Sequence, residues 1–120
     1  MISGHILVDL DGVLAHESPK WLGIEHIGHP IPVMVRRVKR WLKAGLDVRC
    51  FTARIHNDPV AAHHVEQWLK KQGLGKMILT CVKSQSTLEY WDDRAVCVER
   101  NTGRILGRNK TRALPCHKHD

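Results

Sequence analysis

The stretch "HILVDLDGVLAH", residues 5–16, ends a strongly apolar run with two aspartates and a glycine. Its first six residues predict a short buried strand, and Asp11-Gly12 is a turn signal that predicts where this strand ends. Burying a carboxylate without a partner costs several kcal/mol or more. Asp9 and Asp11 therefore need a cation, a proton or a strong hydrogen-bond donor close by.

The apolar pattern beyond this strand predicts helices that alternate with strands. Pro32 opens a helix that Gly45 ends, and Asn57-Asp58-Pro59 opens a second helix that Gly73 ends. Further strands are expected over residues 46–52, 77–82 and 95–98. A strand reached at Leu88 is expected on the other side of the first strand and leads into Asp92-Asp93. Only five residues separate Val82 from Leu88, fewer than a parallel crossover usually has.

Alternating strands and helices are typical of a parallel sheet. We therefore expect an α/β fold: a single three-layer Rossmann-like domain, with a mainly parallel sheet, helices on both faces and no cap domain. This domain is expected over residues 1–103. Residues 104–120 show little periodicity and are expected to form a C-terminal tail on the surface.

Length and composition bound the class of protein. A chain of 120 residues is about one domain, and it can bury roughly two-thirds of its surface without disulfides. No apolar run approaches the ~20 residues of a membrane span, and we see no export signal, so the expected location is the cytoplasm. The net charge of +7 favours anionic partners, either phosphorylated metabolites or nucleic acid. Three cysteines lie inside apolar runs and are expected to be buried and reduced: Cys50, Cys81 and Cys97.

Polar residues interrupt the apolar runs at the ends of the expected strands, where parallel sheets bind their ligands. They should converge on one crevice, and they are Asp9, Asp11, Thr52, Lys83, Asp92 and Asp93. Carboxylates supply the hard oxygen ligands that Mg²⁺ prefers, while a lysine and a hydroxyl suit phosphoryl oxygens. The set therefore predicts a magnesium site beside a phosphate.

At these positions the chain resembles the haloacid dehalogenase superfamily of phosphohydrolases, in particular its small members without a cap domain from bacterial and phage genomes. The resemblance runs from about residue 5 to residue 99. Its four motifs stand in the expected order: Asp9-Leu-Asp11-Gly12-Val13-Leu14, Phe51-Thr52-Ala53-Arg54, Lys83, and Trp91-Asp92-Asp93-Arg94-Ala95. The chain departs from small relatives at Ser84, where they often have a proline after the lysine.

The resemblance implies a role for each matched residue. Asp9 would attack phosphorus and carry an aspartyl-phosphate intermediate, and Asp11 would act as general acid and then as general base. The metal would be held by the Asp9 carboxylate, the Asp11 backbone carbonyl and Asp92, with Asp93 assisting. The phosphoryl group would be bound by Thr52, Ala53, Arg54 and Lys83.

The substrate stays open between a phosphorylated nucleotide, a polynucleotide end and a small metabolite. Without a cap the site would be open, or it would be enclosed by a second subunit. Residues 14–32 form a loop that we expect to select the substrate. Arg54 is expected to contact the substrate or to pair with Asp58.

Two other interpretations remain. In the first, the chain is a catalytically degenerate relative that binds nucleic acid through the basic helix face of residues 36–43. In the second, its C-terminal segment captures a metal. The first predicts binding that weakens steeply with salt and no phosphatase activity. Taken singly, the matched residues also have ordinary explanations, since Asp11-Gly12 suits any turn and Lys83 any solvated surface.

Overall fold

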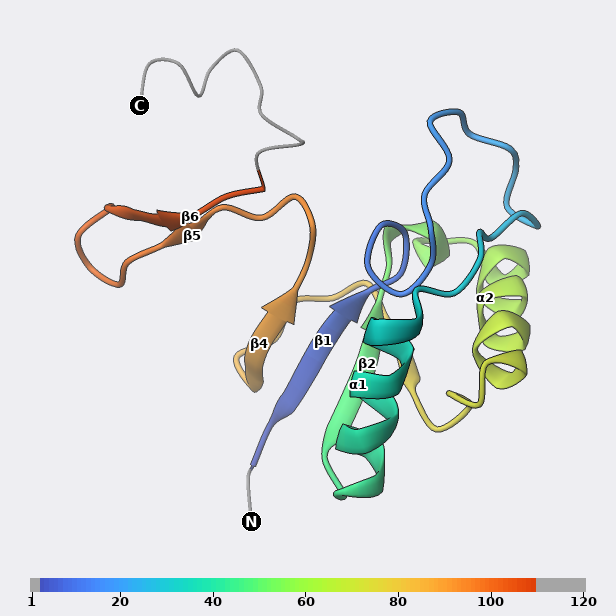
Figure 1. Cartoon of the computed structure of the whole chain (residues 1–120), viewed down its shortest axis with the longest axis horizontal. Coiled ribbons are helices and arrows are strands. Elements are labelled where there is room, and N and C mark those ends of the chain that lie inside the picture. Colours follow the sequence, from blue (N-terminus) through green and yellow to red (C-terminus); the bar gives the residue numbers. More distant parts are fainter. Residues whose placement is uncertain (1–2, 110–120) are drawn as a thin grey trace.

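The computed structural model describes residues 3–109, and the segment Cys116–Asp120, which we considered as a metal-capture site, lies outside them. The elements follow in the order β1 (His5–Asp9), α1 (Pro32–Lys43), β2 (Asp47–Phe51), the short 3-10 helix η1 (Ala53–Ile55), α2 (Pro59–Lys71), β3 (Ile78–Thr80), β4 (Thr87–Trp91), β5 (Cys97–Val98) and β6 (Ile105–Gly107). Figure 1 shows a main sheet beside two helices, with β5 and β6 set apart as a small hairpin.

The main sheet has four strands in the order β3-β2-β1-β4, and all neighbours are parallel. The strand reached near Leu88 therefore lies on the other side of the first strand, as the sequence predicts. Because the strands are parallel, their carboxyl ends meet at one edge. β1 lies between β2 and β4, so the residues after these three strands are neighbours at that edge.

Both helices pack against one face of this sheet. Side chains from α1 and α2 share a single core cluster with alternate residues of β1 and β2, among them Ile6, Val8, Val48, Cys50, Val38 and Val65. The chain moves from β1 to β2 to β3 in one direction, and same-handed crossovers in one direction put their helices on the same face. The α/β class with a parallel sheet is thus observed, while the third layer of the predicted Rossmann-like fold is not confirmed.

The face of the sheet opposite the helices carries no helix within residues 3–109. The link from β3 to β4 contains no helix, because it spans only residues 81–86. In this link the Lys83 ammonium lies 5.3 Å from the Tyr90 ring centroid. Tyr90 pairs in register with Leu7, which is buried although it points away from the helix face. The link therefore crosses this open face and takes the place of a helical layer there.

The two helices begin where their sequences predict. Proline occupies the first turn of each, where a backbone N–H would have no partner within the helix. The Asp58 carboxylate caps α2 by accepting a hydrogen bond from the Ala61 N–H at 2.9 Å. These signals are local in sequence, which explains why both predicted helices are confirmed.

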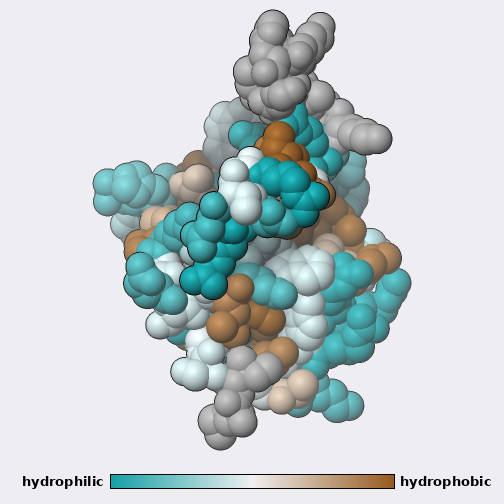
Figure 2. Space-filling model, turned by 90° about the vertical axis from the view of Figure 1, so that its left-hand side faces the viewer, coloured by the Kyte–Doolittle hydropathy of each residue, from teal (hydrophilic) through white to brown (hydrophobic). Residues whose placement is uncertain are grey.

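The last predicted strand belongs to a separate structure. β5 pairs antiparallel with β6, which lies in the segment expected to trail over the surface. Cys97 in β5 is exposed, so the prediction that it is buried was wrong, because β5 has no place in the main sheet. Figure 2, which views the side with β4 and the hairpin, shows brown apolar patches divided by teal polar residues. None of the helices in residues 3–109 is long and apolar enough to span a membrane.

Candidate functional site

Three carboxylates meet at the carboxyl edge of the sheet. Asp9 ends β1, and Asp92 and Asp93 follow β4 directly. Val8 pairs in register with Trp91, so the next residues of these adjacent strands emerge side by side. One ligand oxygen from each of Asp9, Asp92 and Asp93 lies within 4.8 Å of the others. We refer to these three residues as the acidic group.

The surroundings of Asp9 oppose its ionisation. Burial raises the pKa of the Asp9 carboxyl to about 7, and the negative charges of Asp92, Asp93 and Asp11 add to this effect. The Leu10 N–H donates to Asp9 Oδ1 at 2.8 Å, and this hydrogen bond lowers the pKa of Asp9. A cation in the acidic group would relieve the repulsion between its carboxylates.

Local backbone geometry holds the other two carboxylates. Asp92 Oδ1 accepts hydrogen bonds from the Arg94 N–H at 2.6 Å and the Ala95 N–H at 3.1 Å. Asp93 packs against Gly12, where a Cβ would lie 2.5 Å from Asp93 Oδ2. Gly12 also has φ +86°, a backbone conformation that favours glycine. The turn after β1 thus needs glycine both for its shape and for the approach of Asp93.

The acidic group fits a divalent cation by the chemistry of its donors. All three are carboxylates, which suit hard cations such as Mg²⁺ and Ca²⁺ and give no preference between them. The Asp11 carboxylate does not belong to the group. The metal role predicted for Asp11 uses its backbone carbonyl, and that role stays a prediction.

Arg54 holds the side chain of Asp11. Its guanidinium donates to the two Asp11 carboxylate oxygens at 2.7 and 2.9 Å and to the His26 carbonyl at 3.0 Å. Arg54 therefore links the turn after β1 to the loop that follows it. The pairing of Arg54 with Asp58 that the sequence suggested is not found, because the Asp58 carboxylate caps α2. Contact of Arg54 with a substrate stays a prediction.

The hydroxyl predicted to bind phosphate lies between β2 and η1. Thr52 is buried, and its Oγ1 accepts a hydrogen bond from the Arg54 N–H at 3.2 Å. Its own N–H donates to the Thr80 carbonyl of β3 at 3.0 Å. Ala53, the next residue, is exposed and lines the same pocket as Asp9 and Asp92.

Lys83 belongs to the link between β3 and β4. Its ammonium contacts the Tyr90 ring on the open face of the sheet, and within residues 3–109 it forms no ion pair with Asp9. Its proposed contact with phosphate stays a prediction.

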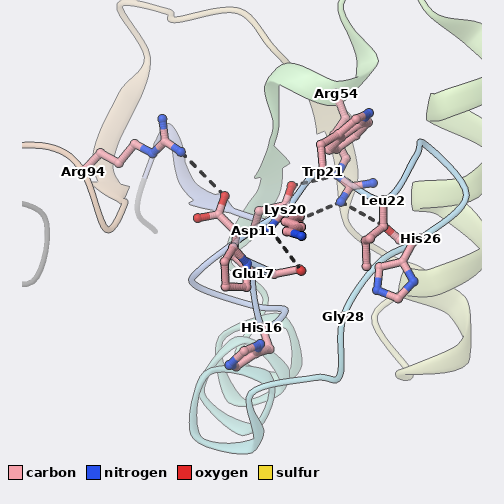
Figure 3. A pocket seen from close by; sticks show the side chains of 12 residues that line it. Asp11, His16, Glu17, Lys20, Trp21, Leu22, His26, Gly28, Arg54 and Arg94 are labelled. Carbon is pink, nitrogen blue, oxygen red and sulfur yellow. Dashed lines mark hydrogen bonds and ion pairs between the residues drawn. The ribbon is translucent and has the colours of Figure 1, made fainter.

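Two pockets adjoin at this edge of the sheet. The acidic pocket, about 320 Å³, is lined by Asp9, Asp11, Glu17, Phe51, Ala53, Arg54, Cys81, Asp92 and Arg94. The loop pocket, about 430 Å³, is lined by Asp11, Arg54, Arg94 and eight residues of the segment 16–26 together with Gly28. Figure 3 shows the loop pocket, with Arg94 on the opposite side from His26. Asp11, Glu17, Arg54 and Arg94 line both pockets.

Sequence reasoning missed the ion pair that joins the two sides of these pockets. Arg94 lies 3.6 Å from Glu17, and its side chain is exposed. Arg94 stands beside Asp92-Asp93, so its position in the site follows from the motif. Glu17 belongs to an aperiodic loop, and no sequence signal indicates its partner.

No protein-family model matches the chain, and the searches of curated proteins and of solved structures found no match either. The chemistry of the site must therefore follow from its own residues.

Proposed function

We propose that the chain is a phosphohydrolase of the haloacid dehalogenase type that cleaves phosphate monoesters with the help of Mg²⁺. The convergence of Asp9, Asp92 and Asp93 within 4.8 Å is the observation that carries the proposal. Two features support it further: the buried hydroxyl of Thr52 follows the neighbouring strand, and Asp11 lines the same pocket as Asp9.

The reaction would proceed in two displacements. An Asp9 oxygen attacks phosphorus and the P–O bond to the ester oxygen breaks, while Asp11 gives that oxygen a proton. Water then attacks phosphorus, Asp11 takes a proton from the water, and the bond between phosphorus and Asp9 breaks to release inorganic phosphate. A divalent cation held by the acidic group would supply positive charge for the phosphoryl oxygens.

Asp9 must be ionised to attack, yet its surroundings raise its pKa to about 7. The positive charge of a cation beside it would lower this pKa and make the carboxylate available. Both Asp11 oxygens accept hydrogen bonds from Arg54. Each oxygen keeps a second lone pair, which is available for proton transfer.

Phosphate release tests this function directly. The full chain is assayed with sugar phosphates, nucleotides and phosphorylated oligonucleotides, with Mg²⁺ and with a chelator. We expect Mg²⁺-dependent hydrolysis of at least one ester, and its loss in Asp9→Asn, which keeps the size of the side chain but removes the nucleophile. Hydrolysis that persists in Asp9→Asn or with the chelator would contradict the proposal.

A second function is favoured by the exposed basic face of α1. Arg36, Lys39, Arg40 and Lys43 are exposed there, whereas Arg37 lies 5.2 Å from the Trp91 ring centroid. Such a face can bind nucleic acid through phosphate contacts. Binding that falls steeply with salt, that is unchanged in Asp9→Asn and that comes without phosphatase activity would favour this function over hydrolysis.

A further inference from the structure

The loop pocket adjoins the acidic pocket and is the larger of the two. Their volumes are about 430 and 320 Å³, within the size range of sites for small organic ligands. Because four residues line both pockets, a single substrate can place its phosphoryl group in the acidic pocket and extend into the loop pocket. The residues that line the loop pocket would therefore contact the part of the substrate beyond its phosphoryl group.

A tryptophan forms part of this lining. The Trp21 side chain is 66 % exposed, an unusual state for so large an apolar ring. The Arg54 guanidinium lies 4.8 Å from its ring centroid, and Figure 3 shows the two side chains stacked at the edge of the pocket. Arg54 is itself fixed by Asp11 and by the His26 carbonyl. The loop thus presents a flat aromatic surface on a rigid support.

Charge in the loop pocket favours an anionic ligand. Its basic side chains are Lys20, Arg54 and Arg94, and its acidic side chains are Asp11 and Glu17. The two acidic residues pair with Arg54 and Arg94, respectively. The exposed Lys20 adds positive charge beyond these pairs. An aromatic surface together with excess positive charge is what proteins use to hold a nucleobase next to a phosphate.

We propose that the loop pocket binds a nucleobase stacked on Trp21, so that the substrate of the acidic pocket is a nucleoside phosphate. This inference rests on the proposed phosphohydrolase function and names its substrate class. The nucleoside phosphate can be a free mononucleotide or the terminal unit of an oligonucleotide, because both present the same base and phosphate to the two pockets.

The first test compares a substrate that has a base with one that lacks it. We expect kcat/KM for adenosine 5′-monophosphate to exceed that for ribose 5-phosphate by about tenfold or more, as one stacked base would give. Trp21→Leu should bring the ratio of the two kcat/KM values close to one. Trp21→Phe, which restores an aromatic face, should retain most of the advantage of the nucleotide. Equal kcat/KM for both substrates, or an equal loss for both in Trp21→Leu, would overturn the nucleobase site.

A second measurement separates failure of this inference from failure of the proposed function. Calorimetry with adenosine 5′-monophosphate and ribose 5-phosphate, carried out on Asp9→Asn, measures binding without turnover. If no ester is hydrolysed but the nucleotide binds about tenfold more tightly than the sugar phosphate, and only when Trp21 is present, the nucleobase site stands and the phosphohydrolase function falls. Equal binding of both ligands would overturn the site whatever the activity. A 5′-phosphorylated trinucleotide is assayed beside the mononucleotide. The higher kcat/KM of the two shows whether the substrate is an oligonucleotide end or a free mononucleotide.

Discussion

At the scale of single residues, Asp9 is held in its protonated form up to about neutral pH, because burial and three nearby carboxylates raise its pKa to about 7. An unfolded chain ionises this group near its ordinary pKa of about 4. Between these two pH values the folded state binds more protons, so the metal-free protein loses stability as the pH rises. The shift of about three units corresponds to on the order of 4 kcal/mol, and solvent screening of the partly exposed group reduces this to about 2 kcal/mol.

Asp9→Asn should therefore stabilise the metal-free protein in a pH-dependent way. We expect almost no gain over wild type near pH 4, and a gain that grows to about 2 kcal/mol above pH 7. Urea unfolding in the presence of a chelator, at pH values from 4.5 to 8, measures the difference. A gain of the same size at every pH would show that the pKa of Asp9 is not raised in the folded protein.

Gly12 is the second residue at which the geometry of the site predicts the effect of a substitution. In Gly12→Ala the new Cβ would lie 2.5 Å from Asp93 Oδ2, at a backbone φ of +86°. We expect a loss of about 1–2 kcal/mol in folding free energy from the backbone alone, and weaker Mg²⁺ binding because Asp93 is displaced.

Gly45→Ala is the matched control for Gly12→Ala. Gly45 has almost the same φ, +87°, but nothing lies within 4 Å of its Cβ position. Calorimetric titration with Mg²⁺ should show weaker binding in Gly12→Ala and wild-type binding in Gly45→Ala, with a similar loss of stability in both. Unchanged Mg²⁺ affinity in Gly12→Ala would mean that Asp93 takes no part in the metal site.

The residues of the acidic group can be predicted from the sequence because they follow strands of one parallel sheet, and the topology alone brings such residues together. The contacts of Arg54 cannot be predicted in this way. Its bonds to Asp11 and to the His26 carbonyl depend on how the aperiodic loop 16–29 closes, which no periodicity encodes. The position of Lys83 is hard to predict for a similar reason, because it depends on the path of the six-residue link 81–86.

At the scale of elements, β4 matters most for the site because Asp92 and Asp93 follow it directly. Its last residue, Trp91, contacts α1 through two side chains. The ring centroids of Trp91 and Trp41 are 5.0 Å apart in an edge-to-face arrangement, and the Arg37 guanidinium lies 5.2 Å from the Trp91 ring centroid. These contacts fix the end of an edge strand against the helix layer.

Trp91→Leu should loosen this end of β4. We expect a loss of about 1–3 kcal/mol in folding free energy together with weaker Mg²⁺ binding, because the backbone that leads to Asp92 is no longer fixed. Trp91→Phe retains an aromatic ring and should lose less of both. Thermal unfolding and Mg²⁺ titration of the two variants measure these effects. A destabilised Trp91→Leu that binds Mg²⁺ like wild type would contradict the link between Trp91 and the metal site.

The elements themselves follow from the sequence to different degrees. α1 and α2 are specified by their prolines, the Asp58 cap and their apolar spacing, and all of these signals are local. The β5–β6 hairpin was not predicted as such. Its strands are too short to show a clear alternation, and its pairing joins residues on either side of the turn at 101–103 rather than the main sheet.

At the scale of the whole molecule, the open face of the sheet distinguishes this chain from the three-layer fold that we expected. Ile78, Leu88 and Tyr90 are exposed on strands of the sheet, and the link 81–86 is the segment that crosses this face. A pattern of apolar residues can predict that a strand lies in a sheet, but it does not say what covers each face. The third layer was inferred from fold class alone, and nothing in the described residues supplies it.

The central claim of this account is that Asp9, Asp92 and Asp93 together hold one divalent cation, and calorimetric titration of the full chain with Mg²⁺ tests it most directly. We predict a single site in the wild type, and an affinity at least about tenfold lower in Asp9→Asn and in Asp92→Asn. Asp47→Asn, which changes an exposed carboxylate at the opposite end of the sheet, should bind like wild type. Equal Mg²⁺ affinity in all four proteins would contradict the claim.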